Sequence, residues 1–208
     1  ISWIRPIYIL ETGIALDVEL VSVNSGKDDR IKFSIVSVEK NELVQHAEGE
    51  AIILPLKREA SGDVKALLNK ATGISILKDV CYDYIKLAGI DYGDSFKIVD
   101  IVHRGIEAGA PFAIGELRLP DALSSTSSQY LLHPSMLDGA IQTSIGLVSD
   151  QVVCRMKQQD TSVFQEQDIM IPFSMKSMEI YGSCKEHMYS IVRDGDPSQK
   201  STFSKLLD

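Results

Sequence analysis

The stretch LLHPSMLDGAIQTSIGLV, residues 131–148, has the pattern of one apolar helix that carries two polar side chains a turn apart. Pro134 suits the first helical turn, where a missing N–H group loses no partner. Asp138 and Gln142 are four residues apart, so on a helix they share one face and can touch. The expected core residues are Met136, Leu137, Ala140, Ile141, Ile145, Leu147 and Val148. A carboxylate among them needs a partner or a chemical purpose.

Alternating apolar residues predict antiparallel strands on both sides of this helix. The early strands are expected at 1–10, 14–23, 30–38 and 43–54, with a hairpin turn at 23–30. The later strands are expected at 95–104, 110–120, 152–156, 169–182 and 186–193. One sheet wrapped around one apolar helix is the plan of a hotdog domain. The second half of the chain shows both parts of this plan, and the first half shows only sheet.

Two further helices and two loops complete the pattern. The helices are expected at 63–71 and 75–88, with Gly89 just after the end of the second. The apolar stripe of that second helix comprises Leu77, Val80, Cys81, Tyr84, Leu87 and Ala88. The polar segments 121–129 and 194–205 are expected to be loops.

Composition argues against several classes of partner. The 208 residues carry a formal net charge of −8, which disfavours nucleic acid as the main partner. No apolar run reaches the roughly 20 residues of a membrane span. Cys81, Cys154 and Cys184 are widely spaced and form no CxxC pair, so they are expected to be reduced thiols of a cytoplasmic protein. No metal site is expected, because His46, His103 and His187 lack ligand spacing with these cysteines.

Five short motifs, in order along the chain, carry a resemblance to a known family. They are ISWIRPIYI at 1–9, VQHAEGEAII at 44–53, GIDYGDSF at 89–96, LHPSMLDGAIQ at 132–142 and MIPFSM at 170–175. They resemble the W-x-x-P, H-x-x-G, GxxYGPxF, HPxxxDxxxQ and LPFxW motifs in dehydratase domains of modular polyketide synthases. Asp94 stands where the family usually has Pro, and Met175 where Trp is common. One such motif is a weak signal, but five in order are a strong one.

The resemblance implies an α+β double hotdog, in which antiparallel sheets wrap around central helices and the first hotdog is incomplete in this chain. Residues 1–58 would be the remaining strands of the first hotdog and 59–74 a linker. Residues 75–208 would be the second hotdog, with its central helix near 134–148.

The implied reaction removes water from a β-hydroxyacyl thioester during polyketide biosynthesis. The substrate is carried on the phosphopantetheine of an acyl carrier protein, and no metal or other cofactor of the domain's own is implied. The implied partners are the carrier protein and neighbouring synthase domains, and a homodimer through the first hotdog is also implied.

The motif match also implies roles for individual residues. Asp138 would be the general acid for the departing hydroxyl, and Gln142 would orient its carboxyl. Burial would raise the Asp138 pKa from its usual value of about 3.9. His133 is expected to be structural rather than a base. The residues implied to bind substrate are Tyr92, Gly93, Phe96, His133, Pro134, Pro172 and Phe173.

The family's second catalytic residue, a His in an HxxxGxxxxP motif, is absent from this sequence. His46 is followed by Gly49, but its neighbours match a later strand of the family, so we reject it as the base. The simplest expectation is that the start of the first hotdog is missing before Ile1, and the alternative is a degenerate domain. Half a hotdog would expose an apolar face and strand edges. Residues 1–208 alone are therefore expected to fold poorly, and soluble, active expression of them would contradict this.

Other activities on the same fold stay open. Pyran-forming cyclases and double-bond-shifting isomerases often replace the Asp of HPxxxD, whereas Asp138 is present here, which favours dehydration. A product-template domain that cyclises poly-β-keto chains, and a vestigial scaffold domain, are further alternatives. A thioesterase hotdog is disfavoured because those are shorter single repeats.

Overall fold

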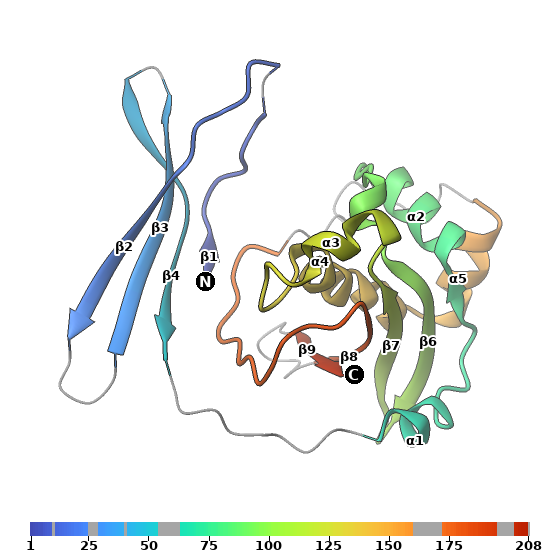
Figure 1. The fold of residues 1–208 in the computed structure, drawn as a ribbon. Coiled ribbons are helices and arrows are strands. Elements are labelled where there is room, and N and C mark those ends of the chain that lie inside the picture. The colour runs from blue at the N-terminus through green and yellow to red at the C-terminus, as the bar shows by residue number, and fades with distance from the viewer. Residues whose placement is uncertain are drawn as a thin grey trace. The chain divides into compact units, whose positions relative to one another are not determined.

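The computed structural model describes residues 1–9, 11–24, 29–39, 41–53, 63–159, 172–194 and 202–207. Its strands form two sheets, and the chain divides into two compact units (Figure 1). The first unit comprises Ile1–Arg58 and Met170–Tyr181, and the second comprises Glu59–Ile169 and Gly182–Asp208. The predicted boundaries differ from this division, because they place 170–181 in the second hotdog.

The first unit is an antiparallel sheet in the strand order β1-β4-β3-β2. Its strands are β1 (Ser2–Trp3), β2 (Asp17–Asn24), β3 (Asp29–Glu39) and β4 (Glu42–Ile52). The three strands predicted between 14 and 54 are confirmed. The run 1–10 contributes only β1, because Pro6 follows closely and lacks the N–H group that a further ladder bond needs.

The chain returns to this unit after residue 171. Trp3 N donates to the Phe173 carbonyl and Met175 N donates to the Ile1 carbonyl, both at 2.8 Å, around an isolated bridge between Ser2 and Ser174. The predicted strand 169–182 is therefore wrong for most of its described part, since residues 176–182 join no ladder and are mostly exposed. Residues 169–171 lie outside the described ranges.

The second unit holds a five-stranded antiparallel sheet in the order β5-β6-β7-β8-β9. Its strands are β5 (Ile76–Leu77), β6 (Val99–Glu107), β7 (Ala110–Arg118), β8 (His187–Asp194) and β9 (Thr202–Leu207). The β6–β7 hairpin turns at Ala108 and Gly109, both with positive φ. The predicted loop 194–205 is wrong at its end, because β9 pairs with β8 from Asp194↔Thr202 onwards. β9 lies at the edge of the sheet, where its pairing with β8 supports the strand conformation.

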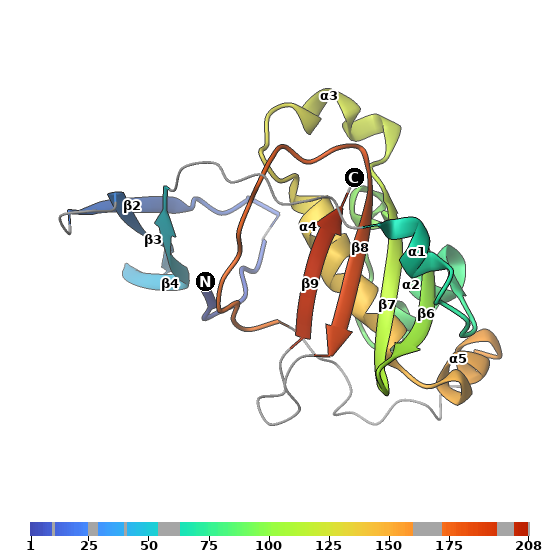
Figure 2. The same cartoon turned by 90° about the horizontal axis from the view of Figure 1, so that it is seen from below.

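The apolar helix predicted at 134–148 lies on this sheet. It consists of α4 (Pro134–Gln142) and the 3₁₀ turn η3 (Thr143–Leu147), and Figure 2 shows α4 beside β7 and β8. Ser190 Oγ on β8 donates to the Ala140 carbonyl at 3.2 Å. The approach is close enough that a Cβ on Gly139 would overlap the side chain of Ile98. One helix packed across one sheet is the arrangement expected for the second hotdog.

The other helices only partly follow the predictions. They are α1 (Val64–Leu68), α2 (Lys78–Leu87), α3 (Ser124–Ser127), α5 (Asp150–Lys157) and the 3₁₀ turns η1 (Asp94–Phe96) and η2 (Asp121–Leu123). Helices were expected at the first two positions, and the segment 121–129 was wrongly expected to be a loop throughout. Segment 59–74, predicted as a linker, contains α1, whose Val64 and Leu67 pack against a core cluster around Phe112.

The strand predicted at 152–156 is wrong, because these residues lie in α5. Ser149 caps the helix by accepting from Val152 N, and Asp150 occupies the first turn, where a negative charge is favourable. Val153 and Met156, three residues apart, form its buried side. The window was too short for its apolar spacing to separate helix from strand.

The buried face of α2 also differs from the predicted stripe. Cys81 and Tyr82 are its buried residues, whereas Leu77 and Leu87 are 55% and 45% exposed. Gly89 follows the helix with φ 98°, as expected for a glycine after a C-cap. The three cysteines are free thiols. Within the described ranges, no helix combines the length and apolarity that crossing a membrane requires.

Candidate active site

The site is built at the start of α4, where His133 is the N-cap. His133 Nδ1 accepts from Ser135 N at 3.2 Å, and Pro134 occupies the first turn. Since Nδ1 accepts, the proton of the neutral ring sits on Nε2, which lies 3.3 Å from Thr126 Oγ1. Burial lowers the pKa of His133, so the ring is neutral at physiological pH. These contacts favour the structural role predicted for His133.

Asp138 and Gln142 meet on one face of α4, as their spacing predicts. Gln142 Nε2 donates to Asp138 Oδ2 at 2.7 Å. Asp138 is half-buried, and Gln142 is 6% exposed. This distance is at the short end of the usual range for an N–H···O hydrogen bond.

The amide of Gln142 makes two further bonds. Its Nε2 donates to the Phe96 carbonyl at 3.1 Å, and its Oε1 accepts from the Tyr82 hydroxyl at 2.8 Å. The Tyr82 oxygen itself accepts from Val99 N at 3.0 Å. The pair on α4 is thereby tied to α2, to η1 and to the first residue of β6.

Burial and hydrogen bonding act on the Asp138 carboxyl in opposite directions. Loss of solvation raises its pKa, while hydrogen bonds from Gln142 and Tyr92 lower it, and burial has the larger effect. Burial also raises the pKa of Tyr92 to about 12, with the nearby Asp138 charge adding to that rise. The site therefore presents a carboxyl that holds its proton more tightly than an exposed aspartate does, beside a neutral phenol.

The residues predicted from the GIDYGDSF segment contribute to the site in different ways. Tyr92 is half-buried, with its ring edge-on to Tyr82 at a centroid distance of 6.1 Å. The Gly93 carbonyl accepts from Phe96 N at 2.9 Å to close η1, which places the Phe96 carbonyl against Gln142. Asp94, where the family usually has Pro, points to solvent 3.5 Å from Lys97. Phe96 contributes its backbone to the site, and its side chain is 38% exposed.

Three residues predicted to bind substrate have no role visible in this cluster. Pro134 is exposed and serves to start α4. Pro172 and Phe173 belong to the first unit, where the Phe173 carbonyl pairs with β1 and its side chain is 77% exposed. A substrate-binding role for these three stays a prediction.

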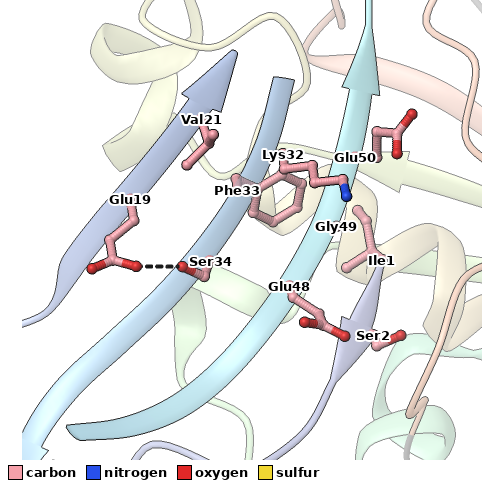
Figure 3. Close-up of a pocket in the computed structure, with 10 residues that line it drawn as sticks. All are labelled: Ile1, Ser2, Glu19, Val21, Lys32, Phe33, Ser34, Glu48, Gly49 and Glu50. Atoms are coloured by element: carbon pink, nitrogen blue, oxygen red, sulfur yellow. Dashed lines mark hydrogen bonds between the residues drawn. The ribbon is translucent and has the colours of Figure 1, made fainter. Parts of the chain in front are cut away.

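A cavity of about 430 Å³ lies on the sheet of the first unit and has a different character (Figure 3). Its carboxylates are exposed, and Glu19 Oε2 accepts from Ser34 Oγ at 3.0 Å. The Phe33 ring covers Gly49, which faces it in the β3–β4 register. The exposed carboxylates of this cavity therefore differ from Asp138, which is half-buried on an apolar helix.

The remaining histidines have structural partners. His46 is 2% exposed, with Nε2 2.8 Å from Ser37 Oγ and Nδ1 3.3 Å from the Arg5 carbonyl. Both of its ring nitrogens are engaged, which agrees with its rejection as a base. His103 Nε2 lies 2.7 Å from Glu116, and His187 Nε2 lies 3.3 Å from Arg118.

Tyr82 is the site residue that the sequence did not reveal. The predicted stripe on its helix passed through Val80, Cys81 and Tyr84 instead, and its partner Gln142 is 60 residues away. The available signal was its position: it lies ten residues before Tyr92, on a helix that leads directly into the GIDYGDSF segment.

Comparison with known proteins places the chain in a family. A family model described as the polyketide synthase dehydratase N-terminal domain matches residues 64–202. The polyketide synthases PksN and PksL of Bacillus subtilis (strain 168) are 28% and 26% identical to the chain over 193 and 212 residues. These matches cover 92% and 100% of this chain, which spans only 3% and 4% of the two relatives.

Solved dehydratase domains share the fold. A trans-AT polyketide synthase dehydratase domain from Brevibacillus brevis has a TM-score of 0.82 at 23% identity, and the CurF dehydratase domain of the curacin synthase has 0.78 at 22%. Both matches cover 100% of this chain, and 68% and 67% of those chains. An inactive Asp-to-Asn variant of the CurK dehydratase has a TM-score of 0.63 at 21% identity, over 96% of this chain and 72% of that chain.

These structures confirm the predicted double hotdog, of which this chain forms part. The chain belongs to the dehydratase-domain family of polyketide synthases.

Proposed function

We propose that this domain dehydrates a β-hydroxyacyl thioester to the α,β-unsaturated thioester during polyketide synthesis, with Asp138 as the general acid. The observation that carries the proposal is the Asp138 carboxyl, whose pKa is raised by burial and whose Oδ2 is held by Gln142 at 2.7 Å. Family membership supports the reaction class. The inactive Asp-to-Asn variant of the CurK dehydratase supports a role for an aspartate in that relative.

The chemistry needs an acid because hydroxide is a poor leaving group. A base removes a proton from the α carbon, and the electron pair of that C–H bond becomes the second bond between Cα and Cβ. The Cβ–O bond breaks as Asp138 gives its proton to the departing oxygen, which leaves as water. The reaction is redox-neutral, so it needs no electron carrier.

The opposing effects on Asp138 suit this role. Burial keeps the carboxyl protonated at a higher pH than an exposed aspartate, and the Gln142 donor stabilises the carboxylate that forms when the proton leaves. An acid works best when its pKa lies near the working pH, because it must both hold the proton and release it.

The base is proposed to be the histidine of the family's HxxxGxxxxP motif, which this sequence lacks. The thioester is proposed to be carried by the phosphopantetheine of an acyl carrier protein. Tyr92 is the best-placed side chain to contact the β-hydroxyl, because it already bonds to Asp138. Neighbouring synthase domains are expected as partners, since the relatives are much longer polyketide synthases, and the homodimer stays a prediction.

The test measures water loss in the full-length protein. A β-hydroxyacyl chain on a carrier protein is offered to wild type and to Asp138→Asn, and the acyl mass is followed. We expect wild type to remove one water and the variant to be slower by about 10²- to 10⁴-fold, the usual contribution of a general acid. Asp79→Asn, at an exposed position of α2, is the matched control and should retain wild-type activity.

Three results would contradict the proposal. Wild type could leave the substrate unchanged, as a vestigial domain would. It could rearrange the acyl chain without losing the mass of water, as a cyclase or isomerase would. Asp138→Asn could also dehydrate at the wild-type rate, which would assign the acid to another group.

A further inference from the structure

The hydroxyl of Tyr82 lies between the backbone of β6 and the side chain of Gln142. Val99 N donates to the Tyr82 oxygen at 3.0 Å, and the Tyr82 hydroxyl donates to Gln142 Oε1 at 2.8 Å. The Phe96 carbonyl is a more distant acceptor at 3.3 Å. Tyr82 is 8% exposed, so solvent offers its hydroxyl little competition. The hydroxyl thus links a fixed strand to an amide that can otherwise rotate.

The orientation of the Gln142 amide follows from its neighbours. The Phe96 carbonyl can only accept a hydrogen bond, so the amide nitrogen must face it. One N–H serves this carbonyl at 3.1 Å, and the other serves Asp138 Oδ2 at 2.7 Å. A flipped amide would turn its oxygen towards both of these acceptors and its nitrogen towards Tyr82. Because the Tyr82 oxygen already accepts from Val99 N, its O–H group is left to donate, and it favours the same orientation, in which Gln142 donates to Asp138.

This orientation also decides where Asp138 carries its proton. A neutral carboxyl has one O–H and one carbonyl oxygen, and the carbonyl oxygen is the better acceptor. Because Gln142 donates to Oδ2, Oδ2 is the acceptor and the proton is left to Oδ1. We propose that Tyr82 is a positioning residue that, through Gln142, confines the transferable proton of Asp138 to Oδ1. This inference rests on the proposed role of Asp138 as the acid.

The phenols of Tyr82 and Tyr92 and the nearby thiol of Cys81 are neutral in the working range of pH. Burial raises the pKa of Tyr92 and of Cys81 to about 12 each, and it raises the pKa of Tyr82 well above its usual value. On η1, exposed Asp94 lies near Lys97.

Arg104 of β6 lies against η3 and is paired with Asp150, whereas the charged side chains of β7 and β8 lie on the face away from α4. Gly115 and Leu117 of β7 and Ser190 of β8 contact α4–η3, so the residues that alternate with them point the other way. Glu116, Arg118, His187 and Arg193 are these alternating residues. Among the described residues of the second unit, Asp138 is thus the group expected to set the alkaline limb of a pH profile.

A double-mutant cycle in the full-length protein tests whether Tyr82 acts through Gln142. Tyr82→Phe keeps the ring and removes the hydroxyl, and Gln142→Leu removes the amide. We expect kcat to fall by about 10-fold in the first and about 100-fold in the second, with little change in KM, because a misplaced acid slows the chemical step. The double variant should be no slower than Gln142→Leu alone, since Tyr82 then has nothing to orient.

A merely structural role for Tyr82 gives a different result. The two losses in kcat would then multiply in the double variant, and this outcome would overturn the proposal. Tyr189→Phe, on β8 and outside the site, is the matched control and should keep the wild-type kcat.

The pH profile supplies a second readout. Tyr82→Phe weakens the donation of Gln142 to the Asp138 carboxylate, so the Asp138 pKa should rise and the alkaline limb of kcat should move to higher pH. Since Tyr82→Phe also leaves the buried Val99 N–H without its acceptor, the variant could fold poorly. Replacing Tyr82 by 3-fluorotyrosine keeps both the hydroxyl and the packing, and makes the hydroxyl a stronger donor.

The fluorinated variant should move the alkaline limb to lower pH, opposite to Tyr82→Phe, because a more polarised amide donates more strongly to Asp138. An unchanged limb would overturn the proposal. Failure of the proposed function gives a different result, because the wild-type enzyme would then remove no water from the substrate. If wild type is active and Asp138→Asn is not, but the losses at Tyr82 and Gln142 multiply, only the role of Tyr82 fails.

Discussion

Asp138 combines two properties that conflict in an ordinary protein interior. Burial raises its pKa because the charged form loses solvation, and the hydrogen bonds from Gln142 and Tyr92 recover only part of that loss. A carboxyl in this position destabilises the folded state once it ionises, so its retention on an apolar helix is understandable if it performs chemistry.

The stability of the fold should therefore depend on the ionisation of this residue. The Asp138 pKa is higher in the folded state than in the unfolded state, so its favourable contribution is complete below the unfolded pKa of about 3.9 and is lost as pH rises through the folded pKa. Asp138→Asn keeps an acceptor for Gln142 but cannot ionise. We expect the Tm of the variant to match wild type near pH 4 and to exceed it at pH 8. Thermal melts at the two pH values check this, and a variant less stable than wild type at pH 8 would contradict it.

At this scale, sequence reasoning succeeded where a contact is local. The Asp138–Gln142 pair follows from helical spacing alone, and the start of the helix follows from Pro134. Tyr82 could not be found in this way, because its bond to Gln142 depends on how α2 packs against α4.

Among the elements, the segment that follows α4 is held by Arg104 of β6. This arginine is 7% exposed, and its guanidinium donates to the carbonyls of Gly146 and Val148 and to Asp150. The bond from Nε to the Gly146 carbonyl is 2.8 Å long. One side chain thus satisfies carbonyls at the end of η3 and fixes the start of α5.

Replacing Arg104 by Met keeps much of the side-chain volume but removes every donor. We expect the free energy of unfolding to fall by about 3 kcal/mol, because the carbonyls it serves lose their partner inside the protein. Chemical denaturation measures the loss, and hydrogen exchange should show it first in η3. Arg118→Met is the control: its side chain is 58% exposed in an ion pair with Asp100, so the change should stay within about 0.5 kcal/mol. Equal losses in the two variants would contradict the role of Arg104.

Some of these helices and strands could be predicted from the sequence pattern, and others could not. The long strands β6, β7 and β8 were predictable because apolar, β-branched and aromatic residues are frequent over eight or nine positions in each. The apolar residues of Val152–Met156 fit the two-residue period of a strand and the 3.6-residue period of a helix equally well. Only the cap at Ser149 and the packing of Val153 make the segment helical. Thr202–Leu207 is a strand because it pairs with β8, and no short-range pattern records that pairing.

On the scale of the whole chain, the two units are not consecutive segments. The first unit takes residues from both halves, because the segment around Ser174 pairs with β1. The predicted boundaries missed this return, since a pairing between residues 1–3 and 173–175 leaves no periodic signal in either segment. The family resemblance gave the double hotdog without giving this detail.

Because residues 173–175 pair with β1, a substitution at Met175 should loosen β1 although the two lie far apart in the sequence. Met175→Pro removes the N–H group that donates to the Ile1 carbonyl at 2.8 Å. We expect hydrogen exchange at Trp3, whose N–H donates to Phe173, to become faster, while β6–β8 keep their protection. Met175→Leu retains the N–H and serves as the control. Unchanged exchange at Trp3 in the proline variant would show that the pairing contributes little to the first unit.

The same pairing sets an order of events during synthesis. Ile1 and Met175 are 174 residues apart, so one side of β1 stays without its partner while β5, β6, β7 and α4 are made. At the usual rate of about 5–20 residues per second, this delay is roughly ten to thirty seconds. β1 is thus made well before its partner segment, and the growing chain has an open sheet edge for that whole interval.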